Sequence, residues 1–213
     1  IKDVYQYKLF KKKNQHIINT AKNFIEKEIN ISVDGNPEIT INENLVNETK
    51  SRYKIDEKKF NILLGIGGSG PTKRIPSKIF INFMRLVSKK YDCNFFLATG
   101  KNVEEQKILN EILKTELKKK CLPLDDLSLK EIMPVIRNCK ISICNDSSFS
   151  HLSAALGIQT IVLMSDTPLL YGSYSPRMHA IIPDGESTVT HNTLGKDRID
   201  PNKILEKLNI ILN

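Results

Sequence analysis

The sequence lacks the features that would place the protein in a membrane or outside the cell. No apolar run approaches the ~18 residues that a membrane-spanning helix needs, and nothing in the 213 residues resembles a signal peptide. The four cysteines form no CxxC pair and have no histidine partner at metal-binding spacing. We therefore expect a protein of the reducing cytoplasm that uses no disulfide, no metal and no other cofactor.

Arginine is scarce although the formal net charge is +8, and this argues against nucleic acid as a partner. Lysine supplies most of the positive charge, whereas forked contacts to bases and phosphates favour arginine. Two explanations of the charge stay open: a solvated lysine surface, or attraction to phosphorylated lipid at the inner face of the inner membrane. The longest basic cluster, Lys11-Lys12-Lys13, precedes an expected helix and suits either explanation.

The chain begins with Ile1 and not with methionine, so we expect it to start inside a longer polypeptide. Its first 60 residues are more polar than the rest and contain no candidate site. The elements expected there are a helix over residues 17–29, a turn over 34–37, a short alternation at Ile39 and Ile41, and a polar helix opening at Asn42 or Asn44. We interpret residues 1–60 as a connector and the remnant of a missing N-terminal domain, and residues 61–213 as one domain.

From residue 61 onward, short apolar runs alternate with longer amphipathic stretches. Strands are expected at 61–66, 94–98, 141–144, 158–164 and 180–182, and helices at 77–89, 103–119, 128–138, 148–156 and 202–212. Buried strands in alternation with helices are typical of a parallel sheet covered on both faces. The fold class is therefore α/β, a doubly wound, Rossmann-like parallel sheet, with its ligand at the carboxyl ends of the strands.

A glycine-rich loop, residues 65–70, follows the first of these strands and matches G-x-G-x-x-G. Its context does not fit a dinucleotide fingerprint, because six residues separate the glycines from the next helix and the second strand ends without an acidic residue. No Gly-Lys-Ser/Thr follows, so it is not a P-loop either. Backbone amides with Ser69, Thr72, Lys73 and Arg74 suit a diphosphate; a turn with a solvated lysine is the structural alternative.

A second candidate element, Asn145-Asp146-Ser147-Ser148-Phe149-Ser150-His151, joins the strand at 141–144 to a helix. It therefore combines a strand's carboxyl end with a helix N-terminus, where amide groups and the helix dipole favour an anion. His151 lies about one turn into the helix and, when protonated, would offset charge on a leaving diphosphate. The structural alternative is an ordinary N-cap followed by a half-buried histidine.

Several motifs together resemble glycosyltransferase family 9, the heptosyltransferases of the lipopolysaccharide inner core. The family's Asp-Ser/Thr-Gly-x-x-His before an Ala-rich helix matches Asp146–Ala155. Its glycine or threonine loop with Lys-x-Trp-Pro matches residues 67–76, its Gly-x-x-x-Glu matches Gly100–Glu104, and a later loop resembles 165–168. The resemblance covers residues 61 to about 178 in order and spacing, which makes it more specific than any single motif.

The resemblance implies a GT-B enzyme with two Rossmann-like domains, of which this chain would supply the second, the donor-binding one. The residues at positions that hold the donor's diphosphate and sugar are Ser69, Thr72, Lys73, Asp146, Ser147, Ser148 and His151. Glu104 would bind the ribose hydroxyls, and the loop around Leu127 would receive the base. The implied reaction is metal-independent inverting transfer, with ADP-heptose as the favoured donor and a glycan or glycolipid of lipopolysaccharide type as acceptor.

The sequence departs from the family at three points. Ser148 stands where the family has glycine, Ile75 stands where it has tryptophan, and the family's catalytic base lies in a first domain for which no residue here can stand. The chain alone should therefore bind a donor without transferring it. Two other functions stay open: an NAD(P)-dependent oxidoreductase built on the glycine loop, and a non-catalytic nucleotide-binding module.

Overall fold

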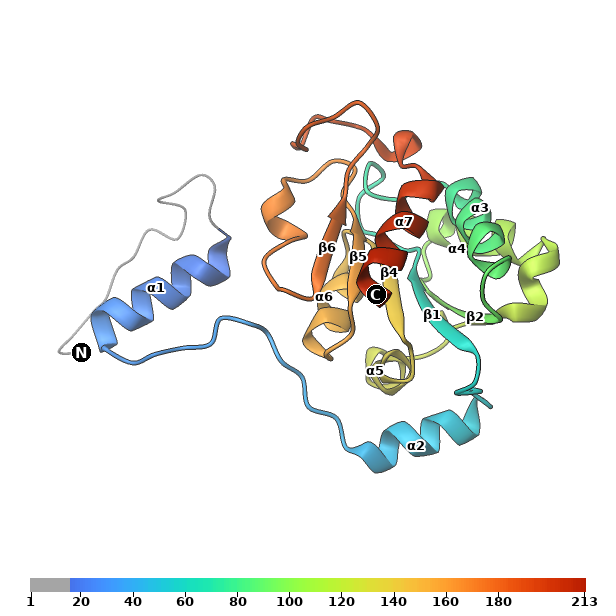
Figure 1. Ribbon diagram of the computed structural model, residues 1–213, viewed down its shortest axis with the longest axis horizontal. Coiled ribbons are helices and arrows are strands. Elements are labelled where there is room, and N and C mark those ends of the chain that lie inside the picture. The colour runs from blue at the N-terminus through green and yellow to red at the C-terminus, as the bar shows by residue number, and fades with distance from the viewer. Residues whose placement is uncertain (1–15) are drawn as a thin grey trace.

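The computed structural model describes residues 16–213, and within this part of the chain six parallel strands form one sheet. In chain order the strands are β1 (Phe60–Gly65), β2 (Cys93–Ala98), β3 (Cys121–Pro123), β4 (Ile141–Asn145), β5 (Thr160–Leu163) and β6 (Met178–Ile181). Their order in the sheet is β3-β2-β1-β4-β5-β6. The chain therefore winds outward from β1 in one direction and then returns to continue in the other, which confirms the doubly wound fold (Figure 1).

Helices cover both faces of this sheet (Figure 1). The covering helices are α3 (Ser77–Ser88), α4 (Val103–Leu113), α5 (Leu129–Arg137), α6 (Ser148–Ala155) and α7 (Pro201–Leu212), with short 3-10 turns η1 (Glu116–Lys120), η2 (Leu169–Tyr171) and η3 (Lys196–Arg198) between elements. From residue 16 onward, two further helices precede the sheet: α1 (Ile17–Ile29) lies away from it, and α2 (Glu43–Arg52) packs on α5 (Figure 1). Ile62 and Leu64 of β1 share a core with α3, α4 and α7, whereas Leu63 between them packs with α5 and α6. Because both faces are buried, the strands are continuous apolar runs, and this made them predictable.

The predicted helix over 103–119 is wrong in its second half. The α-helix ends at Leu113, and a 3-10 turn follows because the Thr115 hydroxyl donates to the Ile112 carbonyl and also accepts from the Leu117 amide at 3.3 Å. Leu117 is thereby buried beneath the turn. The chain then enters β3, a three-residue edge strand that sequence analysis did not predict, because it is short and only partly buried.

The segment before the sheet contains α1, a long extended stretch and α2 (Figure 1). The alternation at Ile39 and Ile41 forms no strand; the Ile39 amide donates to the Ala155 carbonyl at 2.8 Å, and both side chains pack against the core beside α5. The Lys11–Lys13 cluster lies outside the described residues. Between residues 16 and 213, no helix is both long and apolar enough to cross a membrane.

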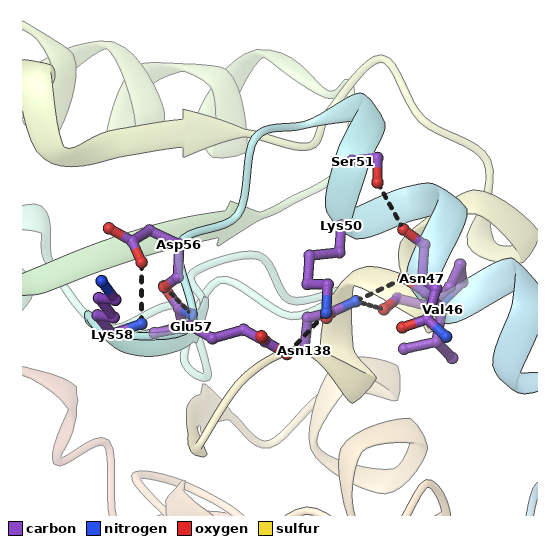
Figure 2. Close-up of polar contacts among 10 residues, drawn as sticks. Val46, Asn47, Lys50, Ser51, Asp56, Glu57, Lys58 and Asn138 are labelled. Carbon is purple, nitrogen blue, oxygen red and sulfur yellow. Dashed lines mark hydrogen bonds and ion pairs between the residues drawn. The ribbon is translucent and has the colours of Figure 1, made fainter.

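Helix α2 is held against α5 by a small set of polar contacts (Figure 2). The Asn138 side-chain amide, at the end of α5, donates to the Val46 carbonyl at 3.1 Å and to the Pro134 carbonyl at 2.8 Å. Nearby, Lys50 of α2 pairs with Glu57 at 2.8 Å, but the Glu57 side chain is 70% exposed. The partly buried amide contacts should therefore contribute more to the packing of α2 on α5 than the exposed ion pair.

We expect Asn138→Ala to lower the free energy of unfolding by about 1–2 kcal/mol, because two carbonyl acceptors lose their donor. Glu57→Gln is the matched control and should cost less than about 0.5 kcal/mol, since exposed ion pairs contribute little. Urea unfolding of both variants measures the difference. Equal effects of the two substitutions would show that the Asn138 contacts do not hold α2 in place.

Candidate functional site

Four loops meet at the carboxyl ends of β1, β2, β3 and β4 and enclose a cleft of about 640 Å³. The cleft lies where β1 and β4 are neighbours and their following loops diverge, the usual ligand position in such a sheet. Four of the predicted site residues line it, namely Ser69, Leu127, Ser147 and Ser148. Gly67, Gly68, Thr99 and Glu105 complete its inner wall.

The glycine loop is fixed in shape by contacts to both neighbouring strands. The buried Asn145 side-chain amide donates to the carbonyls of Ile66 and Gly67, at 2.9 and 3.1 Å. A Cβ on Gly67 would lie 2.5 Å from the Glu105 carboxylate and 3.1 Å from the Thr99 backbone. Glycine is therefore required there by close approach, and α3 begins only at Ser77, so no helix opens within the glycines.

Glu105, and not Glu104, faces the cleft. Its carboxylate accepts from the Gly68 amide at 2.6 Å and from the Asn102 side-chain amide, and its side chain is buried. Glu104 is exposed and lines a separate pocket beside Arg74 and Lys107. Glu104 was expected to bind the ribose hydroxyls; of the two neighbouring glutamates, it is Glu105 that lines this cleft.

A sequence signal for Glu105 was present. Asn102 is the N-cap of α4, and its side chain accepts from the Glu105 amide at 3.0 Å. Asparagine followed three residues later by glutamate is the spacing of a capping box, in which the glutamate turns back toward the cap. In this chain that return places the Glu105 carboxylate under the glycine loop.

Two buried hydroxyl groups in the cleft have no hydrogen-bond partner within the described residues, Thr99 Oγ1 and Ser147 Oγ. Ser147 occupies the N-cap position of α6, yet its side chain makes no capping bond. The alternative in which Ser147 serves only as a helix cap is therefore not what the structure shows. Buried polar groups are satisfied in most proteins, so two unsatisfied hydroxyls on one wall indicate a place for a polar ligand.

A charged cluster lies where the glycine loop and the start of α6 meet. Lys73 Nζ is 2.7 Å from Asp146 Oδ2, and the Asp146 side chain is only 6% exposed. His151 Nε2 lies 4.0 Å from Asp146 Oδ1, while its other nitrogen, Nδ1, is 2.7 Å from the Tyr174 hydroxyl. Thr72, the residue before Lys73, is held through its backbone, because its carbonyl accepts from the Ser165 hydroxyl at 2.8 Å.

Burial disfavours the protonated form of His151. Desolvation lowers its pKa below the ordinary value of 6.5, and Lys73 lowers it further, while the nearby Asp146 carboxylate partly opposes both effects. Desolvation also raises the pKa of the Tyr174 hydroxyl, so this group stays protonated. Without a ligand, the cluster therefore holds one cation, one anion and neutral rings.

Three aromatic side chains near His151 were not predicted. His16, which precedes α1, stacks on Tyr174 with ring centroids 4.2 Å apart and packs edge-on against Tyr171 at 5.7 Å. Desolvation also lowers the pKa of His16. Because more than 150 residues separate His16 from the two tyrosines, no local pattern in the sequence could have joined them.

Residues 4–193 match glycosyltransferase family 9 (heptosyltransferase). The chain belongs to this family. It is 23% identical over 164 residues to lipopolysaccharide heptosyltransferase 1 of Campylobacter coli, a match that covers 74% of this chain and 46% of that protein. The chain thus spans about half the length of this curated relative.

Solved structures support the same fold for this family 9 chain. It resembles E. coli ADP-heptose LPS heptosyltransferase II with a TM-score of 0.67 and 22% identity, covering 93% of this chain and 62% of that one. It also resembles the family 9 glycosyltransferase of Veillonella parvula with a TM-score of 0.74 and 17% identity, covering 97% and 62%. The Rossmann-like sheet expected of a GT-B glycosyltransferase is confirmed.

The electrostatics of the cluster predict how His151 titrates. In the ligand-free chain its pKa should lie below 6.5, and it should rise when a diphosphate binds nearby. NMR titration of the ring protons measures both values. His179, whose pKa is also lowered by burial but which hydrogen-bonds to Gln159 outside the cluster, is an internal control that should not respond to the ligand.

The lowered pKa of His151 also determines the direction in which the stability of the protein changes with pH. Because the folded-state pKa of His151 is lowered, the unfolded chain takes up this proton first as pH falls through about 6.5. The stability that neutral His151 contributes is therefore lost progressively below that pH, and His151→Gln should weaken the acid dependence of the melting temperature. A His151 pKa above 6.5 without ligand would contradict this account.

Proposed function

We propose that this family 9 chain binds the nucleoside diphosphate of a nucleotide-sugar donor, for transfer of the sugar to a glycan acceptor. The observation that carries the proposal is the Lys73–Asp146–His151 cluster beside the N-terminus of α6, next to a cleft with unsatisfied hydroxyl groups. The cluster supplies hydrogen-bond donors and a histidine that can take up a proton, and the cleft supplies space. Together they suit a ligand with one anionic end and one largely neutral end.

The diphosphate is assigned to the junction of the glycine loop and α6. Lys73 uses one hydrogen-bond donor on Asp146 and retains donors for phosphate oxygens. The first amides of α6 have no acceptor within the helix, and its dipole favours an anion at that end. Ser147, whose buried hydroxyl has no partner among the described residues, lines the adjoining cleft together with the exposed Ser69 and Ser148.

The nucleoside is assigned to the remainder of the cleft. The Glu105 carboxylate is held by Gly68 and Asn102 and can accept further hydrogen bonds from ribose hydroxyls. Leu127, Leu129 and Ile132 form an apolar wall against which a base can pack. Base identity would then depend mainly on backbone groups, which is why the sequence does not specify it.

The chemistry assigned to this chain is stabilisation of the departing diphosphate. As the bond between sugar and phosphate breaks, negative charge grows on the phosphate beside Lys73, the helix N-terminus and His151. A rise in the pKa of His151 would let it take up a proton and offset this charge. These groups can stabilise the departing charge without a divalent cation, so we propose metal-independent transfer, with the inversion that the family resemblance implies.

The names of two relatives indicate which donor and which acceptor to expect. The E. coli structure is named for ADP-heptose, and the Campylobacter protein for lipopolysaccharide, so ADP-heptose and a lipopolysaccharide-type glycolipid are the favoured pair. The base that activates the acceptor is assigned to a partner domain, as expected from the sequence. The lysine-rich surface would face anionic lipid in this arrangement.

Titration of ADP, UDP, GDP and NADH against this chain tests the proposal. We expect ADP to bind best and NADH to bind poorly. Lys73→Ala and His151→Ala should each weaken ADP binding about 10-fold or more, since charge-assisted hydrogen bonds contribute about 1.5–3 kcal/mol. Lys78→Ala, at an exposed lysine of α3, is the control and should leave affinity unchanged. Tight NADH binding without nucleoside diphosphate binding would overturn the proposal.

Adjacent glutamates offer a matched pair for the ribose assignment. Glu105→Gln should weaken ADP binding about 10-fold, because a carboxylate acceptor is lost and the glycine loop loses its anchor. Glu104→Gln removes the same charge from an exposed position outside the cleft and should have little effect. Isothermal titration calorimetry of both variants gives the comparison. If Glu104→Gln proved the more damaging, the assignment of the ribose to Glu105 would be wrong.

A further inference from the structure

His151 lies in a stack of three rings that no motif of the family accounts for. Tyr174, from the loop between η2 and β6, places its hydroxyl 2.7 Å from His151 Nδ1, with the two rings within 19° of parallel. The His16 ring also contacts Tyr174, with ring centroids 4.2 Å apart and the two rings within 19° of parallel. His16 is 8% exposed, so its ring is held within the protein beside Tyr174, which is itself partly buried.

The geometry points to Tyr174, braced by His16, as a positioning residue that fixes the tautomer and ring orientation of His151. This inference rests on the proposed function for the role of His151 itself. It assigns to two residues outside the family motif the task of aiming Nε2 of His151 at the place of the departing phosphate.

The groups at the two nitrogens of His151, Asp146 at Nε2 and Tyr174 at Nδ1, together determine which nitrogen carries the proton. Asp146 Oδ1 lies 4.0 Å from Nε2, and a carboxylate favours a proton on the nitrogen that faces it. Nδ1 is then the acceptor, and the protonated Tyr174 hydroxyl is its donor. Lys73, on the far side of Asp146, disfavours a second proton while no ligand is bound. The neutral Nε2–H tautomer therefore presents a donor toward the diphosphate region.

His16 has a defined orientation of its own. Its Nδ1 accepts from the Ile18 amide at 3.2 Å, so this ring serves both as the N-cap of α1 and as the stacking partner of Tyr174. Figure 1 shows the start of α1 directed toward the loop that carries Tyr171 and Tyr174. The position of α1 and the state of His151 are consequently linked through one ring pair.

The test compares two hydroxyl deletions in the whole chain. Two-bond proton–nitrogen NMR of His151 should show the Nε2–H tautomer in the unsubstituted chain and a mixture with Nδ1–H in Tyr174→Phe. Tyr91→Phe is the matched control, because Tyr91 also stacks on another ring, that of Phe60. Tyr91 lies before the first residue of β2, whereas the cleft lies at the carboxyl end of that strand. It should leave the His151 signals unchanged.

ADP titration adds a functional readout. Tyr174→Phe should weaken ADP binding about three- to tenfold, the loss expected for one hydrogen bond, and Tyr91→Phe should not. His16→Asn, which keeps a capping acceptor for Ile18 but removes the ring, should shift the tautomer in the same direction by a smaller amount. No shift in His16→Asn would remove His16 from the proposal.

An unchanged tautomer in Tyr174→Phe overturns the inference, whether or not ADP affinity falls, because a loss of affinity alone would indicate general damage to the loop. The tautomer comparison is made on the ligand-free chain. It therefore still decides the role of Tyr174 if ADP, UDP and GDP all fail to bind, an outcome that would instead overturn the proposed function.

Discussion

The ion pair between Lys73 and Asp146 is the interaction on which the rest of the site depends. It joins residues 73 positions apart in the chain and ties the loop after β1 to the loop after β4. Asp146 is almost fully buried, and an unpaired carboxylate in that position would carry a large desolvation cost. The pair thus fixes the path of the glycine loop, the start of α6 and, one turn later, the place of His151.

The strand order explains why these loops can meet at all. β1 and β4 are neighbours in the sheet although two complete strand–helix units separate them in the chain. Because the chain leaves β1 toward one face and β4 toward the other, the two loops diverge and leave a crevice. The crevice stays narrow at its base, where the Asn145 amide binds the glycine-loop carbonyls and Gly67 meets Glu105.

Most of the sheet was predictable from sequence, and so was one side of the site. β1, β2 and β4 are apolar runs between turn residues, and the capping box of Ser128 and Glu131 opens α5 as predicted. The misses have physical causes. β3 is a short, partly exposed edge strand, so its sequence shows no apolar run. Adjacent helical residues point in directions about 100° apart, so Glu105 lines the cleft and Glu104 does not. Tyr174 and His16 meet only through tertiary contact.

For catalysis, the site must stabilise the departing diphosphate more strongly than it stabilises the intact bound donor. The charge state of the cluster affects this difference. Without ligand, Lys73 and Asp146 form an ion pair, and burial disfavours the protonated form of His151. A site filled with permanent cations would hold the intact donor and the departing diphosphate with similar strength, which does not accelerate the chemical step. A histidine whose pKa rises with the local negative charge responds most when that charge is greatest. On the proposed function, the neutral ground state of His151 is therefore what allows its stabilisation to grow along the reaction.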